Sequence, residues 1–418
     1  MKELWQVGRI SIANNCFEAV DGACRRRRIS KPREASKVIR VLIADDSAFM
    51  RKVLSDLFNS QNDFQVVGTA KNGQDAVDKV KKFQPDVLTL DVIMPTMDGL
   101  SALAIIMEQC PLPVVMISST TQKGTNETIR ALALGAVDFV SKEGGAISKI
   151  DTIKDEILAK CRLAAGARPH RNASSAASNK PLVYTPKPPE PPTTRRIEVR
   201  RRTGLVLGQK PTINRIPSTL PPKVLPPTGK KLVTIGTSTG GPQALQSVIT
   251  RLPGNLPCGV VVVQHMPAGF TRSLAERLNS ISEISVKEAE HDEIIRPGQV
   301  YIAPGNFHLR IAPASATERK IVLSQEPPVG NHRPAVNVMF DSAAQFGRDL
   351  VSVIMTGMGC DGCEGMKKIK ETGGYSIAQD ENSCVVYGMP KAVVEAGLAD
   401  EVKPLNKIAE AIVDAVRR

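Results

Sequence analysis

Short apolar runs rich in β-branched residues recur along the chain and alternate with amphipathic stretches that have helical spacing. Runs of this composition are typical of strands buried on both faces of a parallel sheet, with the helices covering those faces. We therefore expect a doubly wound parallel sheet over residues 38–165 and a second α/β domain over 230–418. In the first region the strand-like runs lie at 38–44, 64–70, 86–91, 113–118 and 137–140, and the helix-like stretches lie at 48–60, 74–82, 99–109, 122–134 and 147–163.

A proline- and arginine-rich segment separates these two regions. Residues 166–229 contain 13 of the chain's 30 prolines, together with twelve basic and two acidic residues. Proline cannot donate a backbone hydrogen bond and interrupts helices, so we interpret the segment as an extended, semi-stiff linker. Residues 1–37 form a basic N-terminal extension that we expect to be disordered. An early start codon is our leading explanation for this extension, and an arm for anionic surfaces is the alternative.

The positive charge of the chain lies outside the two predicted domains. The net charge is +13, of which residues 1–37 carry +5 and residues 166–229 carry +10, which leaves −2 for the rest. A strongly basic protein can bind nucleic acid, but here the segments predicted to fold are nearly neutral. We predict no nucleic-acid partner. A nucleic-acid-binding regulator is kept as the alternative function because of the run Arg25–Arg28.

Cysteine usage and hydropathy indicate the compartment. The eight cysteines are scattered and form no dense framework, as expected of free thiols in a reducing compartment. No stretch approaches the ~18 apolar residues of a membrane helix, and no signal-peptide pattern opens the chain. We expect a cytoplasmic protein without membrane insertion. Cys360 and Cys363 form one isolated CxxC motif, for which metal binding or redox chemistry is a weak alternative.

Acidic residues follow two of the predicted strands in region 38–165. Asp45 and Asp46 come after the first strand, and Asp91 ends the third. Because the carboxyl ends of parallel strands meet at one edge, these carboxylates should converge and attract Mg²⁺. The cation would let Asp91 attack a phosphoryl group. Ser118 and Lys142, which end the next two strands, could hold phosphate oxygens.

This segment resembles the receiver domains of response regulators over its whole length. The resemblance implies a flavodoxin-like fold in which a histidine kinase phosphorylates Asp91. It also implies that Asp45 and Asp46 bind Mg²⁺ together with Asp91, and that Ser118 and Phe139 relay the switch. The matching motifs are Asp45-Asp46, Asp91-Val92-Ile93-Met94-Pro95-Thr96-Met97-Asp98-Gly99, Ser118 and Phe139-Val140-Ser141-Lys142.

Region 230–418 contains Gly-x-Ser-x-Gly at residues 236–240, between a strand and a helical pattern. Such a turn exposes a nucleophilic serine, here Ser238, although a phosphate-binding glycine loop fits this motif equally well. His265 ends a second valine-rich strand, and Asp361 lies in a glycine-rich turn after a third. Three strand ends thus supply the groups of a Ser-His-Asp relay. Other aspartates are not excluded, and His291, His308 and His332 lie in mixed polar contexts.

This region resembles the catalytic domain of the chemotaxis protein-glutamate methylesterases. The resemblance implies a Rossmann-like three-layer domain in which Ser238 is the nucleophile, His265 the general base and Asp361 its orienting partner. N–H groups near Thr239 and Met358 would stabilise the oxyanion. The motifs that carry it are Ile235-Gly236-Thr237-Ser238-Thr239-Gly240-Gly241, Gln264-His265-Met266-Pro267-Ala268-Gly269-Phe270-Thr271, Ala303-Pro304-Gly305 and Thr356-Gly357-Met358-Gly359-Cys360-Asp361-Gly362.

The resemblance also implies substrate and control. The substrates would be γ-glutamyl methyl esters of methyl-accepting chemotaxis receptors, and receptor glutamines would be deamidated by the same acyl-enzyme route. No cofactor is expected in the esterase domain. The unphosphorylated receiver would cover the active site, and phosphorylation at Asp91 would weaken that packing. A pseudo-enzyme that only docks on receptors is the remaining alternative.

Overall fold

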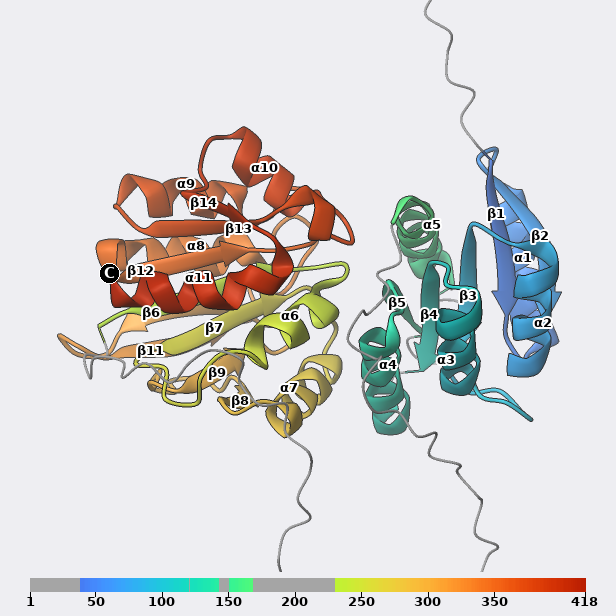
Figure 1. Cartoon of the computed structure of the whole chain (residues 1–418), viewed down its shortest axis with the longest axis horizontal. Helices are drawn as coiled ribbons and strands as arrows, with labels where there is room; N and C mark the ends of the chain where they lie inside the picture. The colour runs from blue at the N-terminus through green and yellow to red at the C-terminus, as the bar shows by residue number, and fades with distance from the viewer. Residues whose placement is uncertain (1–37, 120, 143–149, 168–229) are drawn as a thin grey trace, which may run out of the picture. The chain divides into compact units, whose positions relative to one another are not determined.

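The computed structural model describes residues 38–119, 121–142, 150–167 and 230–418 (Figure 1). The predicted basic extension, 1–37, lies outside the described residues, and so does the predicted linker from residue 168 onward. The first two linker residues instead belong to the folded part, because Gly166 ends helix α5 and Ala167 is buried. In the part of the chain that the structure describes, none of the helices combines the length and apolar character needed to cross a bilayer.

The first sheet has five parallel strands in the order β2-β1-β3-β4-β5. Helices α1 and α5 pack on one face, and α2, α3 and α4 on the other. This confirms the predicted doubly wound sheet, whose strand order reverses between β1 and β3. The elements are β1 (Ile39–Ala44), α1 (Ala48–Asn59), β2 (Phe64–Ala70), α2 (Gly73–Phe83), β3 (Val87–Asp91), α3 (Gly99–Gln109), β4 (Val114–Ser119), α4 (Gln122–Leu134), β5 (Asp138–Lys142) and α5 (Ile150–Gly166).

The second sheet has seven strands in the order β14-β13-β12-β6-β7-β9-β8, and every neighbouring pair is parallel. Helices α6, α7 and α11 contribute to the core on one face, and α8, α9 and α10 to the core on the other. The three-layer prediction is therefore confirmed. The strands are β6 (Leu232–Thr237), β7 (Gly259–Gln264), β8 (Ser285–Glu288), β9 (Gln299–Ile302), β12 (Leu350–Ile354), β13 (Tyr375–Gln379) and β14 (Glu401–Lys403).

Six helices, two short 3-10 helices and an antiparallel hairpin complete this part of the chain. The hairpin, β10 (His308–Pro313) and β11 (Arg319–Ser324), forms a separate two-stranded sheet that our sequence interpretation did not predict. The helices are α6 (Gly241–Ile249), α7 (Phe270–Ile281), α8 (Val336–Ala343), α9 (Cys363–Glu371), α10 (Met389–Glu395) and α11 (Leu405–Arg417), and the 3-10 helices are η2 (Ala344–Asp349) and η3 (Glu381–Ser383).

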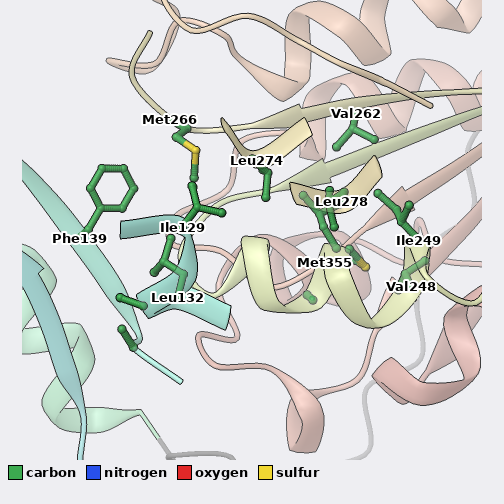
Figure 2. Close-up of a cluster of buried hydrophobic side chains, with 14 of the residues drawn as sticks. Ile129, Leu132, Phe139, Val248, Ile249, Val262, Met266, Leu274, Leu278 and Met355 are labelled. Atoms are coloured by element: carbon green, nitrogen blue, oxygen red, sulfur yellow. The ribbon is translucent and has the colours of Figure 1, made fainter. Parts of the chain in front are cut away.

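Residues of both sheets' helices share one buried apolar cluster (Figure 2). Ile129 of α4 and Phe139 of β5 belong to it, as does Leu274 of α7. The rings of Phe139 and Phe270 stack with their centroids 4.5 Å apart. The predicted switch residue Phe139 is thus buried against α7, the helix that follows β7.

We predict that a buried hydroxyl pair stabilises the second sheet through both of its members. Thr234 of β6 and Ser352 of β12 are fully buried, and their hydroxyl oxygens lie 2.8 Å apart. Removing one hydroxyl leaves the other without a partner, which should cost about 1–3 kcal/mol of unfolding free energy. Urea unfolding should therefore show that Thr234→Val and Ser352→Ala each destabilise the protein, whereas the double variant lies closer to wild type. Additive losses would contradict this coupling.

Candidate functional site

Ser238 lies in a tight turn between the end of β6 and the start of α6. Its N–H donates to the carbonyl of Thr356 over 3.0 Å, and its carbonyl accepts from Gly241 over 2.8 Å. Gly240, which precedes the helix, has a φ of 75°, a conformation that glycine adopts without strain. A Cβ at Gly241 would lie 1.9 Å from Oε1 of Gln264. The glycines predicted around the serine are therefore required by backbone geometry and by close packing.

Gln264 holds this turn to the next strand end, and sequence reasoning did not single it out. The side chain is buried at the last position of β7 and accepts a hydrogen bond from Oγ1 of Thr237 over 2.6 Å. Its Nε2 donates to the carbonyls of Ser238 and His265, both at 3.0 Å. One amide group thus connects the two residues that follow β6 and β7. The available signal was a polar residue ending a run of four valines.

His265 and Asp361 form a buried hydrogen-bonded pair. The distance from Nε2 of His265 to Oδ2 of Asp361 is 2.7 Å, and the side chains are only 6% and 9% exposed. The carboxylate also accepts the N–H groups of Val336 and Asn337, at 2.7 and 2.9 Å, at the start of α8. Burial alone would raise the pKa of Asp361, but the hydrogen bonds from His265 and from the backbone outweigh it and keep that pKa below its usual value.

The contacts of the imidazole assign its tautomer. Because the ionised Asp361 can only accept, the hydrogen of the neutral His265 ring lies on Nε2, which leaves the lone pair on Nδ1. Nδ1 is buried and has no hydrogen-bond partner among the described residues. Thr237 pairs with Gln264 in the β6–β7 register, so Ser238 and His265 leave the sheet side by side. The structure therefore joins His265 to Asp361 and places Ser238 at the adjacent strand end, without a bond from Ser238 to the imidazole.

The two predicted oxyanion residues flank this site. Thr239 is buried, and its hydroxyl donates to Oδ2 of Asp138 over 2.6 Å. Met358 is 47% exposed and follows Gly357, where an added Cβ would lie 2.8 Å from Cβ of Ser238. Both backbones thus adjoin the nucleophile turn.

The CxxC motif and its neighbours show no metal-binding set. Cys360 is exposed, and Cys363 is partly buried and donates weakly to the carbonyl of Ala392 over 3.5 Å. Neither thiol is in a disulfide. Within the described residues, the acidic cluster of the first sheet is the group of potential ligands that converges closely enough for a metal ion.

That acidic cluster consists of Asp45, Asp46 and Asp91. One ligand oxygen from each lies within 4.8 Å of the others, at the carboxyl ends of β1 and β3. Nζ of Lys142 lies 2.9 Å from Asp45 and 2.8 Å from Asp91. Burial raises the pKa of Asp91 despite the opposing Lys142 charge. Burial lowers the pKa of Lys142, but the two carboxylates outweigh it, so that pKa is raised. Hard oxygen ligands held this closely fit a divalent cation such as Mg²⁺.

The remaining predicted receiver residues lie at neighbouring strand ends. Ser118 is buried at the end of β4, and its hydroxyl donates to the carbonyl of Gly124 over 3.2 Å. It pairs in register with Ser141, the residue before Lys142. Phe139 is also buried, beneath Nζ of Lys160 at 5.2 Å from the ring centroid. The structure therefore brings Lys142 to the acidic cluster and places Ser118 and Phe139 in the strands beside it.

Comparison with known proteins identifies the family. Residues 233–412 match the CheB methylesterase family, and residues 41–153 match the response regulator receiver domain. A protein-glutamate methylesterase/protein-glutamine glutaminase of Symbiobacterium thermophilum is 48% identical over 380 residues, which cover 90% of this chain and 97% of that protein. The chain belongs to this methylesterase/glutaminase family. The protein of the same name from Thermotoga maritima is 43% identical over 384 residues, covering 91% of this chain and 99% of the relative.

Two solved structures each resemble one part of the chain. The catalytic domain of Thermotoga maritima CheB methylesterase is 50% identical, with a TM-score of 0.43. The match covers 45% of this chain and 98% of the solved domain. The response regulator domain of Thermotoga maritima CheB is 46% identical, with a TM-score of 0.30. The match covers 32% of this chain and all of the solved domain.

We predict that Asp361→Asn strongly slows the reaction of Ser238 with a fluorophosphonate probe. An asparagine amide can donate to Nε2 and would favour the tautomer with hydrogen on Nδ1, which cannot accept the serine proton. Loss of this orientation costs about 10⁴-fold in comparable relays. Asp341→Asn, at an exposed carboxylate of α8 paired with Lys368, is the matched control and should react normally. Equal labelling rates for Asp361→Asn and wild type would contradict the assigned tautomer.

Proposed function

We propose that the chain hydrolyses γ-glutamyl methyl esters of chemotaxis receptors and releases methanol. The observation that supports this most directly is the buried hydrogen-bonded pair of His265 and Asp361. His265 follows β7, the strand paired with β6, and Ser238 follows β6. A serine becomes an effective nucleophile only when an oriented imidazole takes its proton, and this pair supplies that orientation. The relatives' name, protein-glutamate methylesterase/protein-glutamine glutaminase, supports ester hydrolysis at glutamyl side chains.

In the first half-reaction, Nδ1 of His265 accepts the proton of Ser238 as its oxygen attacks the ester carbonyl carbon. This transfer requires the hydroxyl and Nδ1 to come within hydrogen-bonding distance, a contact that often tightens only when substrate binds. Backbone N–H groups near Thr239 and Met358 face the developing oxyanion in our proposal. The intermediate collapses, the C–O bond to the methoxy group breaks, and the imidazolium protonates the leaving methanol.

In the second half-reaction, water attacks the acyl-enzyme after giving its proton to His265. The proton returns to Ser238 as the acyl C–O bond breaks, and a glutamate side chain is released. The same steps convert a glutamine side chain into glutamate when ammonia is the leaving group. We therefore propose that deamidation of receptor glutamines uses the same Ser238 and His265.

Control is proposed to begin at Asp91. Asp45, Asp46 and Asp91 would hold Mg²⁺, which neutralises the charge of a phosphoryl group when bound. Asp91 would accept that group from a histidine kinase, and Lys142 would then contact a phosphate oxygen in place of two carboxylates. Phosphorylation would thus break the ion pairs from Lys142 to Asp45 and Asp91. Because Lys142 ends β5, we propose that this strand then shifts.

A hydrogen bond links β5 to the nucleophile turn. Asp138, the first residue of β5, accepts from the hydroxyl of Thr239, the residue after Ser238. Phe139 stacks on Phe270. We propose that these contacts hold the esterase in a less active state until phosphorylation weakens them. The free thiols of the described residues fit a reducing compartment, which supports a cytoplasmic location.

The decisive measurement is methanol release from a methylated receptor fragment, with and without acetyl phosphate and Mg²⁺. Wild type should release methanol faster with the phosphodonor. Ser238→Ala should release none above background, whereas Ser315→Ala, at an exposed serine, should match wild type. Asp91→Asn, or removal of Mg²⁺ by a chelator, should keep the basal rate and lose the stimulation. Unchanged release from Ser238→Ala would leave a receptor-docking pseudo-enzyme as the better description.

We also predict that Asp138→Ala raises the basal rate without any phosphodonor. The variant removes the acceptor of the Thr239 hydroxyl, and coupling contacts of this kind are commonly worth about 5-fold or more. Asp63→Ala is the control, because Asp63 pairs with Arg162 and makes no such bond. The basal rate of methanol release is measured for all three proteins at equal concentration. A basal rate identical to wild type in Asp138→Ala would exclude this contact as a restraint.

A further inference from the structure

A second imidazole lies against the proposed general base. The rings of His265 and His332 are nearly parallel, with centroids 3.8 Å apart and an interplanar angle of 11°. Sequence reasoning placed His332 in a mixed polar context, with no link to the site. Its ring covers one face of the imidazole whose Nε2 is bonded to Asp361 and whose Nδ1 has no partner among the described residues.

A tight turn presents His332 in this position. The backbone groups of Val329 and His332 exchange two hydrogen bonds, of 3.1 and 3.0 Å. The two residues between them, Gly330 and Asn331, have φ values of 58° and 66°, the left-handed conformations of a type I′ hairpin turn. The next side chain, Arg333, donates to two backbone carbonyls and to Oδ1 of an asparagine. The turn is therefore fixed on both sides of His332.

The same segment also holds Asp361. Three residues beyond Arg333 the chain enters α8, whose first N–H groups, from Val336 and Asn337, donate to the Asp361 carboxylate. A single stretch of about nine residues thus contacts the face of the His265 ring and the carboxylate at its edge. Together these contacts restrict both the rotation and the tilt of the imidazole.

His332 is neutral when the enzyme works. Burial and the neighbouring His265 lower the pKa of His332 to about 4, with Lys160 acting in the same direction and Asp361 opposing them. Because the folded-state pKa is depressed, His332 carries no charge at neutral pH and takes a proton only as the pH falls toward about 4.

We propose that His332 is a positioning residue, whose stacked ring fixes the plane of His265 and supports the imidazolium formed in each half-reaction. This inference rests on the proposed hydrolase function. A flat ring at stacking distance restricts the orientation of Nδ1, and its π face attracts the positive charge that His265 acquires. Misplacing a reacting group by about 1 Å can cost about 10²-fold in rate. A stacking contact that holds Nδ1 of His265 in place can therefore affect the rate of the proposed reaction.

The test compares His332→Phe and His332→Ala in methanol release from a methylated receptor fragment. We expect His332→Ala to lower kcat about 10-fold or more while KM changes less than about 2-fold. His332→Phe, which keeps a flat neutral ring, should recover kcat to within about 3-fold of wild type. His291→Phe, at an exposed histidine beside Asp292, is the control and should match wild type. Thermal unfolding verifies that each variant folds.

Two outcomes overturn the proposal. One is a kcat for His332→Ala equal to wild type. The other is a kcat for His332→Phe as low as that of His332→Ala. If the acidic limb of the pH profile of kcat is lost as well, His332 itself is the titrating base. NMR of the imidazole nitrogens gives a readout without substrate: all three proteins should keep the Nε2–H tautomer that Asp361 sets, and the His265 signals should broaden through ring motion in His332→Ala but not in His332→Phe. If wild type released no methanol, the hydrolase function would fail, and the NMR comparison alone would decide the stacking role.

Discussion

The backbone hydrogen bonds between β6 and its two parallel neighbours determine where the chemistry can occur. Thr237 pairs with Gln264 on one side, and Gly236 pairs with Ile354 on the other. Three chain segments therefore leave the sheet at nearly the same level, each just beyond a strand of apolar residues. Separations of about a hundred residues in sequence become contacts, because parallel strands end at a common edge. The proposed catalytic residues Ser238 and His265 directly follow their strands, and Asp361 lies in the turn after β12.

The buried carboxylate of Asp361 needs several hydrogen-bond donors at that edge of the sheet. A buried charge is tolerated only with several hydrogen-bond donors, and here an imidazole and two backbone N–H groups provide them. The two N–H groups belong to the first turn of α8, where intrahelical partners are lacking and the helix dipole favours an anion. The helix and the relay therefore stabilise each other.

Much of this organisation could be predicted from the sequence, and the reasons are local. Valine-rich runs predict buried strands, and glycines next to a serine or an aspartate predict tight turns, so Ser238 and Asp361 could be located before the fold was known. Gln264 and His332 could not. Their roles depend on what lies opposite them in space. The only local signal for Gln264 was a polar residue ending a run of four valines, and His332 lies in a mixed polar context. The hairpin β10–β11 was missed although residues 308–311 of β10 alternate polar and apolar side chains, and β11 lacks such alternation.

The amide of Gln264 has a consequence for how this edge tolerates change. Its nitrogen donates to the carbonyls that follow both β6 and β7, while its oxygen accepts from a hydroxyl. Glutamate has nearly the same shape but no hydrogen to offer, so it would turn two attractions into repulsions between oxygen atoms. Position 264 therefore requires the hydrogen-bond donors of an amide as well as a side chain of this size. This chain, a member of a methylesterase/glutaminase family, therefore depends at this edge on a glutamine that must keep its own amide.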